Sequence, residues 1–414
     1  MSIPGSLSGL KAYLDRAAFY LTCGSLISIL FSIAVSQILL ALAFAALLLS
    51  SEKLRLPPVK LPLALFIAGT VISLLASGHI RDGTPQIRKF FVLLILLLVY
   101  STFRKISEIR AIVLLWALVA TLSAVRSLFQ FAQKYQEAAA QHKNFYDFYV
   151  GSRITGFMSH WMTFGGEEMI VLLLLAAYLF FSRESRWKTA GWLASFLLIL
   201  SMVLGYTRSI FLLGFPIGLL YLLWFWHKWL VIAAPIAALV IVLLGPASLE
   251  ERVLSAFQPH GETDSNLHRA ITRETGVAMI RAHPWLGVGP EQVKAQFQEW
   301  VPADVARPLP EGWYGHLHNI YLQYAAERGI PTALALFWMI GQILWDFARS
   351  LRTKLANPEA RFVLHGAIAV ILAVLAEGFL EYNLGDSEVL TLFLAMIAFG
   401  YVAKEAADVA DSRA

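Results

Sequence analysis

Long apolar runs separated by short charged stretches dominate the chain. Twelve runs can be marked, with boundaries good to a few residues: 17–33, 35–50, 61–77, 90–103, 111–133, 161–181, 189–205, 209–226, 229–246, 331–348, 362–380 and 388–403. Most are near the roughly 17 to 25 residues that a helix needs to cross a hydrocarbon layer about 30 Å thick. Backbone groups in lipid must be paired within the segment, so the pattern predicts an all-α integral membrane protein with about twelve transmembrane helices.

Lysine and arginine recur in every second connection between these runs. The cations concerned are Lys53, Arg55, Lys60, Arg104, Lys105, Arg110, Arg183, Arg186, Lys188, Lys228, Arg349, Arg352, Lys354 and Arg361. Such residues are retained on the cytoplasmic side during insertion, so these loops and both termini are expected there. The acidic turn 381–388 and two long polar segments, 134–160 and 247–317, are expected on the opposite side.

The segment that follows residue 246 carries helix signals and is not a simple linker. Its N-cap candidates are Thr263, Asp264 and Ser265. They predict a helix that ends at His283 and Pro284, followed by a second helix over 290–300 and a third over 317–328. The predicted organisation is therefore nine membrane helices in 1–246, a capping loop with short helices in 247–330, and three membrane helices with a cytoplasmic tail in 331–414.

Composition agrees with this plan and excludes some chemistry. Of the 414 residues, 58% are hydrophobic and only 15% are charged, which is more apolar surface than a soluble core of this length hides. Cys23 is the one cysteine, so neither an intramolecular disulfide nor a thiolate metal cluster can form.

Ionisable residues gather near the predicted outer ends of the membrane helices. They are Arg81, Arg126, Arg153, His160, Arg208, Arg269, Arg273, His316, His318, Glu377, Glu381 and Asp386. Several arginines with a histidine suit a phosphorylated substrate, because guanidinium stays charged and binds phosphate oxygens in pairs. A polyprenyl diphosphate head group fits this description. The alternative for each arginine alone is contact with lipid phosphates at the membrane surface.

Two of these residues stand out by their surroundings. Arg208 lies between two apolar runs with almost no loop, where its charge needs a partner, either a diphosphate or a carboxylate such as Glu377 or Glu381. His318 is expected at the start of the third cap helix, with Tyr321 and Leu322 on its face, where a neutral imidazole can accept a proton from a sugar hydroxyl.

No metal or other cofactor is expected. His316 and His318 are two residues apart, so on a helix their side chains would diverge, and no cysteine or carboxylate lies near them in the sequence. A carrier for an anionic lipid is an alternative, but such proteins place ionisable groups near the bilayer midplane and often contain repeats, whereas the charges here cluster at one face.

Four patches resemble the O-antigen ligases. His318 and Asn319, followed after nine residues by Gly329 and after two more by Thr332, match the signature H[NSQ]-x9-G-x2-[GTY]. Arg269 followed by the stretch 283–289 (HPWLGVG) resembles the arginine and the Pro-Leu-x-Gly-x-Gly block of the same superfamily. The Thr-Arg-Ser stretch 207–209 and the Arg-x-x-Gly stretch 153–156 resemble two further elements.

The resemblance implies a GT-C-like, metal-independent, inverting glycosyltransferase in the inner membrane of a Gram-negative bacterium, with its active site facing the periplasm. The implied donor is O-antigen on undecaprenyl diphosphate, and the implied acceptor is a sugar hydroxyl of the lipid A-core. Membrane lipids are the surroundings, and no nucleic acid is involved. An O-antigen polymerase and a protein O-oligosaccharyltransferase, which use the same donor, remain alternatives.

Roles follow for individual residues. Arg208 and Arg269 are expected to hold the diphosphate, and His318 is expected to activate the acceptor hydroxyl. Further substrate contacts are expected from Arg153, Asn319, Arg273, His316 and Asp386. The superfamily also uses an acidic residue near the eleventh membrane helix. Glu377, Glu381 and Asp386 compete for this role, and Asp386 is preferred as the partner of an arginine or of the histidine.

Overall fold

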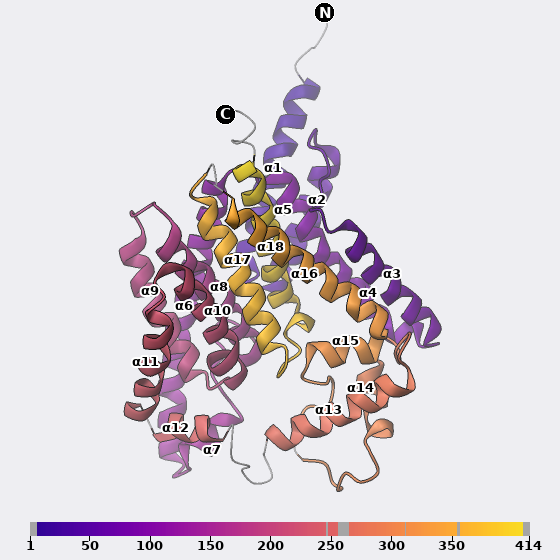
Figure 1. Cartoon of the computed structure of the whole chain (residues 1–414), viewed down its shortest axis with the longest axis vertical. Helices are drawn as coiled ribbons and strands as arrows, with labels where there is room; N and C mark the ends of the chain where they lie inside the picture. Colours follow the sequence, from indigo (N-terminus) through magenta and orange to yellow (C-terminus); the bar gives the residue numbers. More distant parts are fainter. Residues whose placement is uncertain (1–5, 246, 256–264, 311, 354–356, 409–414) are drawn as a thin grey trace, which may run out of the picture.

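The protein is a bundle of long helices with a group of short helices at one end (Figure 1). A computed structural model describes residues 6–245, 247–255, 265–310, 312–353 and 357–408. None of these residues lies in a β-strand. The long helices are α1 (Ser6–Ser28), α2 (Ile33–Leu49), α3 (Lys60–Ala76), α6 (Ile106–Ala140), α8 (Trp161–Phe181), α9 (Lys188–Leu204), α10 (Phe215–Trp226), α11 (Leu230–Leu244), α16 (Ile330–Arg352), α17 (Ala360–Glu377) and α18 (Ser387–Asp408).

Over its described residues, each of the twelve predicted apolar runs is largely helical. Within the described residues, seven segments are long and apolar enough to cross a membrane: 80–102, 106–140, 161–181, 209–226, 330–352, 360–377 and 387–407. Four shorter apolar helices, α2, α3, α9 and α11, coincide with four more of the predicted runs. The chain is thus a multi-pass helical membrane protein, and the number of twelve crossings stays a prediction.

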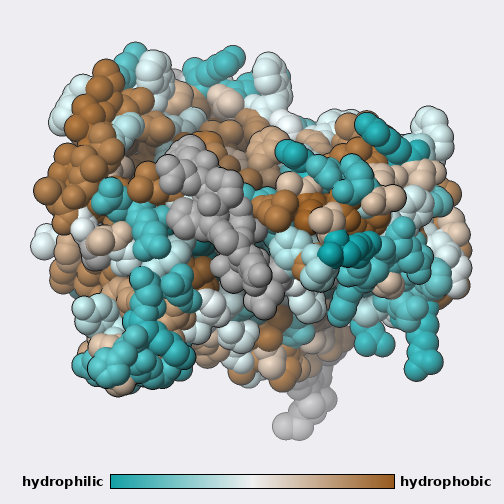
Figure 2. All heavy atoms as spheres, turned by 90° about the horizontal axis from the view of Figure 1, so that it is seen from below, coloured by the Kyte–Doolittle hydropathy of each residue, from teal (hydrophilic) through white to brown (hydrophobic). Residues whose placement is uncertain are grey.

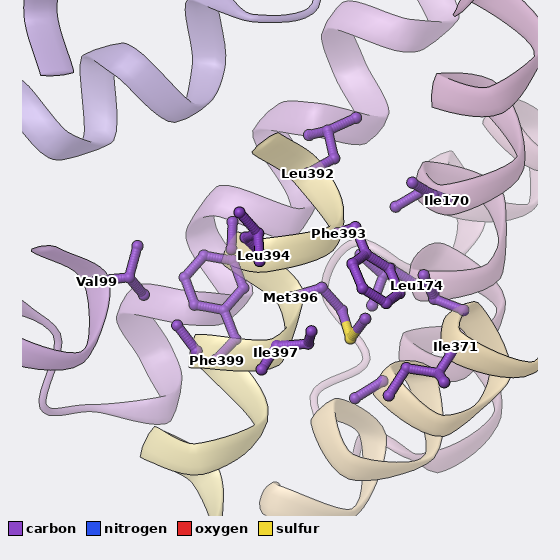
Figure 3. Close-up of a cluster of buried hydrophobic side chains, with 14 of the residues drawn as sticks. Val99, Ile170, Leu174, Ile371, Leu392, Phe393, Leu394, Met396, Ile397 and Phe399 are labelled. Atoms are coloured by element: carbon purple, nitrogen blue, oxygen red, sulfur yellow. The ribbon is translucent and has the colours of Figure 1, made fainter. Parts of the chain in front are cut away.

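The core of the bundle is formed by α8, α17 and α18, which are buried over most of their length. In Figure 3, Phe393 of α18 lies beside Leu174 of α8, and Ile371 of α17 closes the same cluster. By contrast α11 has no buried residue although it is almost wholly apolar, so its surface is suited to lipid. The candidate site lies at the ends of the buried helices α8, α17 and α18.

The cationic loops meet at one end of the bundle, where the first turn of α1 and the last turn of α18 also lie (Figure 1). Arg55 bonds to Glu405 of α18, and Arg104 lies 2.8 Å from Glu52. Arg110 lies 3.5 Å from Glu359. The shared end agrees with the predicted alternation of charge, and its assignment to the cytoplasm stays a prediction. Lys354 lies outside the described residues.

The predicted cap is a set of short helices at the other end of the bundle. It comprises α7 (Phe145–Val150), α12 (Ala247–Leu254), α13 (Ser265–Ala282), α14 (Gln292–Trp300) and α15 (Ile320–Arg328). Viewed from this end, hydrophilic residues gather over much of the face, while hydrophobic ones lie along the flank (Figure 2). Three predicted cap helices are thus present with shifted starts. The N-cap candidates Thr263 and Asp264 lie outside the described residues.

One segment outside the predicted apolar runs is helical. Residues 80–89 form α4 (Ile80–Lys89), which continues through the 3₁₀ turn η1 (Phe90–Leu93) into α5 (Leu94–Thr102). The helical segment is therefore longer than the predicted run 90–103, because the polar α4 precedes this run and extends it toward the cap. The helix brings Gln86 and Lys89 to the site.

The glycines of the stretch 283–289 allow it to pack on the corner between α15 and α16. Val288 N donates to Ala326 O over 2.8 Å, and Gly289 N donates to Glu327 O over 2.9 Å. Gly287 has a φ of +68°, and a Cβ on it would lie 2.3 Å from the backbone carbon of Glu327. Gly329, with a φ of +81°, would place a Cβ 2.1 Å from Trp285 O. Only glycine fits both positions, so these motif residues hold the cap against the bundle.

Candidate functional site

A polar cavity of about 750 Å³ lies between the cap and the ends of α4, α8 and the π-helical turn η2 (Ser209–Gly214). The 3₁₀ turn η3 (Asn383–Gly385), between α17 and α18, completes its wall. Its ionisable lining residues are Lys89, Arg153, His160, Arg208, Arg252, His268, Arg269, Glu291, Lys294, His316, His318, Glu327, Glu381 and Asp386. Six of the eight residues expected to act on substrate line this one cavity: Arg153, Arg208, Arg269, His316, His318 and Asp386.

His318 lies directly before α15 and not on it. Its φ is +48°, in the left-handed region that a non-glycine residue rarely adopts. The expectation that it shares a helical face with Tyr321 and Leu322 is therefore wrong. Its Nδ1 lies 3.2 Å from Glu381 Oε2, and its Nε2 lies 3.1 Å from the carbonyl oxygen of Trp313.

Asn319, the second residue of the signature, fixes this arrangement from outside the cavity. Its side chain accepts a hydrogen bond from Leu322 N over 2.9 Å, which caps α15, and donates to Phe379 O over 3.0 Å. Ile320 N donates to Gly378 O over 2.8 Å. These bonds dock the start of α15 on the end of α17 and so bring His318 next to Glu381. Asn319 thus positions the histidine and does not line the cavity.

Glu381 is the acidic partner of the histidine, so the preference for Asp386 in that role is wrong. Burial opposes ionisation of Glu381, but His318, His316 and Arg269 outweigh it and lower the pKa of the carboxyl to about 2. Asp386 accepts a hydrogen bond from Thr163 Oγ1 over 2.9 Å instead, and burial raises its pKa to about 6. Glu377 accepts from Asn383 Nδ2 over 2.8 Å.

His316 and His318 converge, contrary to the expectation that two histidines in this spacing diverge. Their ring centroids lie 4.1 Å apart, because neither residue is in a helix. Glu381 supplies the carboxylate that the local sequence does not contain. One ligand atom from each of the three residues lies within 4.8 Å of the others, so this set has the donor types of a divalent-cation site.

Two arginines are held by the bend between α9 and η2. Tyr206 has a φ of +51° and is fully buried. Its carbonyl oxygen accepts hydrogen bonds from Arg153 Nη1 over 3.3 Å and from Arg252 Nε over 2.9 Å. Arg208 follows two residues later, and its guanidinium donates to Ser255 Oγ over 3.1 Å and to Asn266 Oδ1 over 3.0 Å. The bend thus sets three guanidinium groups beside one another.

Arg269 reaches the same place from α13. Burial, aided by Arg252, lowers its pKa although Glu381 opposes the change. Burial followed by repulsion from Arg252, Arg269 and Arg208 lowers the pKa of Arg153 to about 9, which leaves it protonated at neutral pH. Four cations that repel one another in a partly dehydrated cavity form a binding site for an anion of more than one charge.

Arg273 does not join this cluster. It lies one turn beyond Arg269 on α13, but its side chain is exposed and does not line the cavity. An exposed arginine of this kind can contact solvent or lipid phosphates. Contact with lipid phosphates was the alternative interpretation of each arginine taken alone.

Several lining residues were not predicted. Arg252 is buried but follows two glutamates in a short polar segment, so nothing local distinguishes it from a surface residue. Lys89 donates to Gly385 O over 3.1 Å, and His268 Nε2 lies 3.0 Å from Trp313 O. The sequence contained a signal for two of these residues. Lys89 lies in the polar, helix-compatible stretch 80–89, and His268 lies next to the predicted site residue Arg269.

Comparison with known families agrees with these observations. A family model described as O-Antigen ligase matches residues 193–337, which include Arg208, Arg252, Arg269 and His318. No curated protein matches the chain. The matched family indicates a glycosyltransferase-like enzyme of the O-antigen ligase or polymerase type. The histidine signature lies inside the matched stretch, and arginines of the same stretch surround one cavity. The match thus supports membership of the O-antigen ligase/polymerase superfamily.

Proposed function

We propose that the protein transfers O-antigen polysaccharide from undecaprenyl diphosphate to a sugar hydroxyl of the lipid A-core. The observation that carries this proposal is the meeting, in one cavity, of four arginines with the His318–Glu381 pair. In this proposal the chain has a GT-C-like plan of twelve crossings in a Gram-negative inner membrane. Its cap faces the periplasm and both termini face the cytoplasm.

The arginines bind the diphosphate of the donor. Arg208 and Arg269 contact the oxygens that gain charge as the sugar departs, and Arg153 and Arg252 add positive charge from the Tyr206 bend. A diphosphate is already a good leaving group, so positioning and charge stabilisation supply most of what the reaction needs.

His318 is the general base. Glu381 accepts a hydrogen bond from Nδ1–H of His318, which leaves the Nε2 electron pair to receive the proton of the acceptor hydroxyl. The acceptor oxygen forms a bond to the anomeric carbon, while the bond from that carbon to the diphosphate oxygen breaks. The diphosphate keeps the electron pair of the broken bond, and attack opposite to the leaving group inverts the anomeric configuration.

Reconstituted transfer tests this function. Purified protein is incubated with the undecaprenyl diphosphate-linked glycan and lipid A-core, and lipopolysaccharide is resolved by gel. Laddered lipopolysaccharide is expected. Longer lipid-linked chains from the donor alone, without modified lipid A-core, would make the protein a polymerase and overturn the assignment of the acceptor.

Replacing Glu381 by glutamine is expected to lower kcat at least about tenfold with little change in the KM for the donor. The amide is neutral and can present either its accepting oxygen or its donating NH2 group to Nδ1, so Nε2 is not reliably the free nitrogen. Steady-state kinetics measure the effect, and Glu381→Asp should recover part of the rate. An unchanged kcat in Glu381→Gln would remove Glu381 from the mechanism.

Chelation is expected to leave transfer unchanged, whereas micromolar Zn²⁺ is expected to inhibit it reversibly. Zn²⁺ bound by His316, His318 and Glu381 would take the electron pair of an imidazole that the reaction uses. Transfer assays with EDTA, and with Zn²⁺ followed by EDTA, measure both effects. Loss of activity in EDTA, restored by a divalent cation, would establish a metal-dependent enzyme instead.

A further inference from the structure

One backbone oxygen lies between two imidazoles of the cavity. The carbonyl oxygen of Trp313 is 3.1 Å from His318 Nε2 and 3.0 Å from His268 Nε2. Trp313 belongs to the irregular stretch 312–315 between α14 and α15, and the residue is 58% exposed. The ring centroids of His268 and His318 lie 5.0 Å apart, so the oxygen bridges two rings that face the same point.

This oxygen contacts the imidazole nitrogen that must be free in the proposed reaction. Nδ1 of His318 faces the Glu381 carboxylate, so Nε2 is the nitrogen left to take a proton from the acceptor. A carbonyl oxygen can only accept a hydrogen bond, so Nε2 must carry a hydrogen while it contacts Trp313. A base in that state cannot accept a second proton there.

His268 is suited to hold an oxygen in the same position. It is buried, and its Nε2 lies 3.0 Å from Trp313 O. Because a carbonyl oxygen can only accept a hydrogen bond, this contact places a hydrogen on Nε2. His268 can therefore donate to an acceptor oxygen, whether that oxygen belongs to the backbone or to a sugar.

The chain next to Trp313 is shaped for this close contact. A Cβ on Gly312 would lie 2.3 Å from His268 Cδ2 and 2.6 Å from His268 Nε2. The φ of Gly312 is outside the left-handed region, so an alanine there would clash with the histidine and not with the backbone. The absence of a side chain at 312 thus lets the stretch 312–315 rest on His268.

We infer that the Trp313 carbonyl stands in the place of the acceptor hydroxyl, that the acceptor displaces the stretch 312–315, and that His268 then positions the acceptor oxygen. When the contact with Trp313 opens, the Nε2 proton of His318 passes to solvent. The hydroxyl of the acceptor then donates a hydrogen bond to the free Nε2 of His318 and accepts one from His268 Nε2, which leaves a lone pair of the hydroxyl oxygen directed away from both rings. Until an acceptor arrives, the stretch 312–315 occludes the base. This inference rests on the proposed role of His318 as base.

Gly312→Ala tests the occlusion without relying on activity. Diethyl pyrocarbonate modifies accessible unprotonated imidazole nitrogens, and peptide mass spectrometry reads the rate at His318 in the full-length protein. The added methyl group should force the stretch 312–315 away from His268 and raise this rate about tenfold. Gly341→Ala is the matched control, because a Cβ there meets nothing within 4 Å. Equal rates in Gly312→Ala and wild type would overturn the inference.

A second variant tests His268 itself. His268→Ala should also raise labelling of His318, and adding Gly312→Ala to it should have no further effect, because the group that the methyl meets is gone. In transfer assays His268→Ala should lower kcat about three- to tenfold and leave the donor KM unchanged, with partial recovery in His268→Gln. A raised donor KM would place His268 in the donor site and contradict the inference.

The two kinds of measurement separate this inference from the proposed function. If Gly312→Ala labels faster at His318 but the protein transfers no glycan to any acceptor, the proposed transferase function is refuted, while the coverage of His318 by the stretch 312–315 is supported. If transfer is normal and labelling of His318 is the same in Gly312→Ala and wild type, the transferase function is supported and the coverage of His318 is refuted.

Discussion

His318→Ala is expected to lower the rate of glycan transfer by about 10² to 10⁴. The proposed base is removed, while the four arginines that bind the donor remain. Binding of the lipid-linked donor should therefore be nearly unchanged. Transfer kinetics and donor binding, measured on the same purified samples, give the two quantities.

The matched control is His283→Ala. His283 also lies in the cap, but its side chain is exposed and outside the cavity, near Trp300. Transfer by this variant should equal that of wild type. Full activity in His318→Ala, or equal loss in both variants, would contradict the assignment of the base.

Arg269→Ala is expected to lower transfer by about 10² to 10³, the usual effect of removing one group that stabilises developing charge. Its guanidinium is one of four around the proposed diphosphate, and a partly buried cation loses less of its effect to solvent than an exposed one. Arg269→Lys should recover only part of the rate, because ammonium does not bind two oxygens in a fixed plane. Kinetics with the lipid-linked donor measure both variants.

Arg273→Ala is the control, since it removes an arginine from the same helix one turn away. Arg273 is exposed and does not line the cavity, so its removal should leave transfer within about twofold of wild type. If both arginine variants lost activity equally, the effect would belong to α13 as a whole and not to the cavity. Arg208→Ala should resemble Arg269→Ala, because Arg208 lines the same cavity from η2.

Several features of the fold could be predicted from the sequence because they depend on local pattern. Apolar runs in lipid must form helices, and each predicted run lies in one. The end of α13 before Pro284 and the turn at Gly329 follow from residues that cannot continue a helix. The cationic loops share one end, as the alternation of charge required.

The pairing of residues far apart in sequence could not be predicted in this way. The carboxylate that meets His318 is 63 residues away in the chain. The spacing of Glu377, Glu381 and Asp386 alone does not distinguish them. Glu381 is selected because Asn319 and Ile320 dock the start of α15 on the end of α17.

The helical membrane bundle, the helical cap and most of the charged residues that meet beneath the cap follow from local sequence, because burial in lipid and helix termination act over a few neighbouring residues. Long-range packing is what brings Arg252 and His268 into the site, keeps Arg273 out of it, and makes His316 and His318 converge. These outcomes depend on left-handed backbone at Tyr206 and His318 and on the packing of α13 and α15 against the bundle. Such contacts are fixed by the arrangement of whole helices, which no short stretch of sequence specifies.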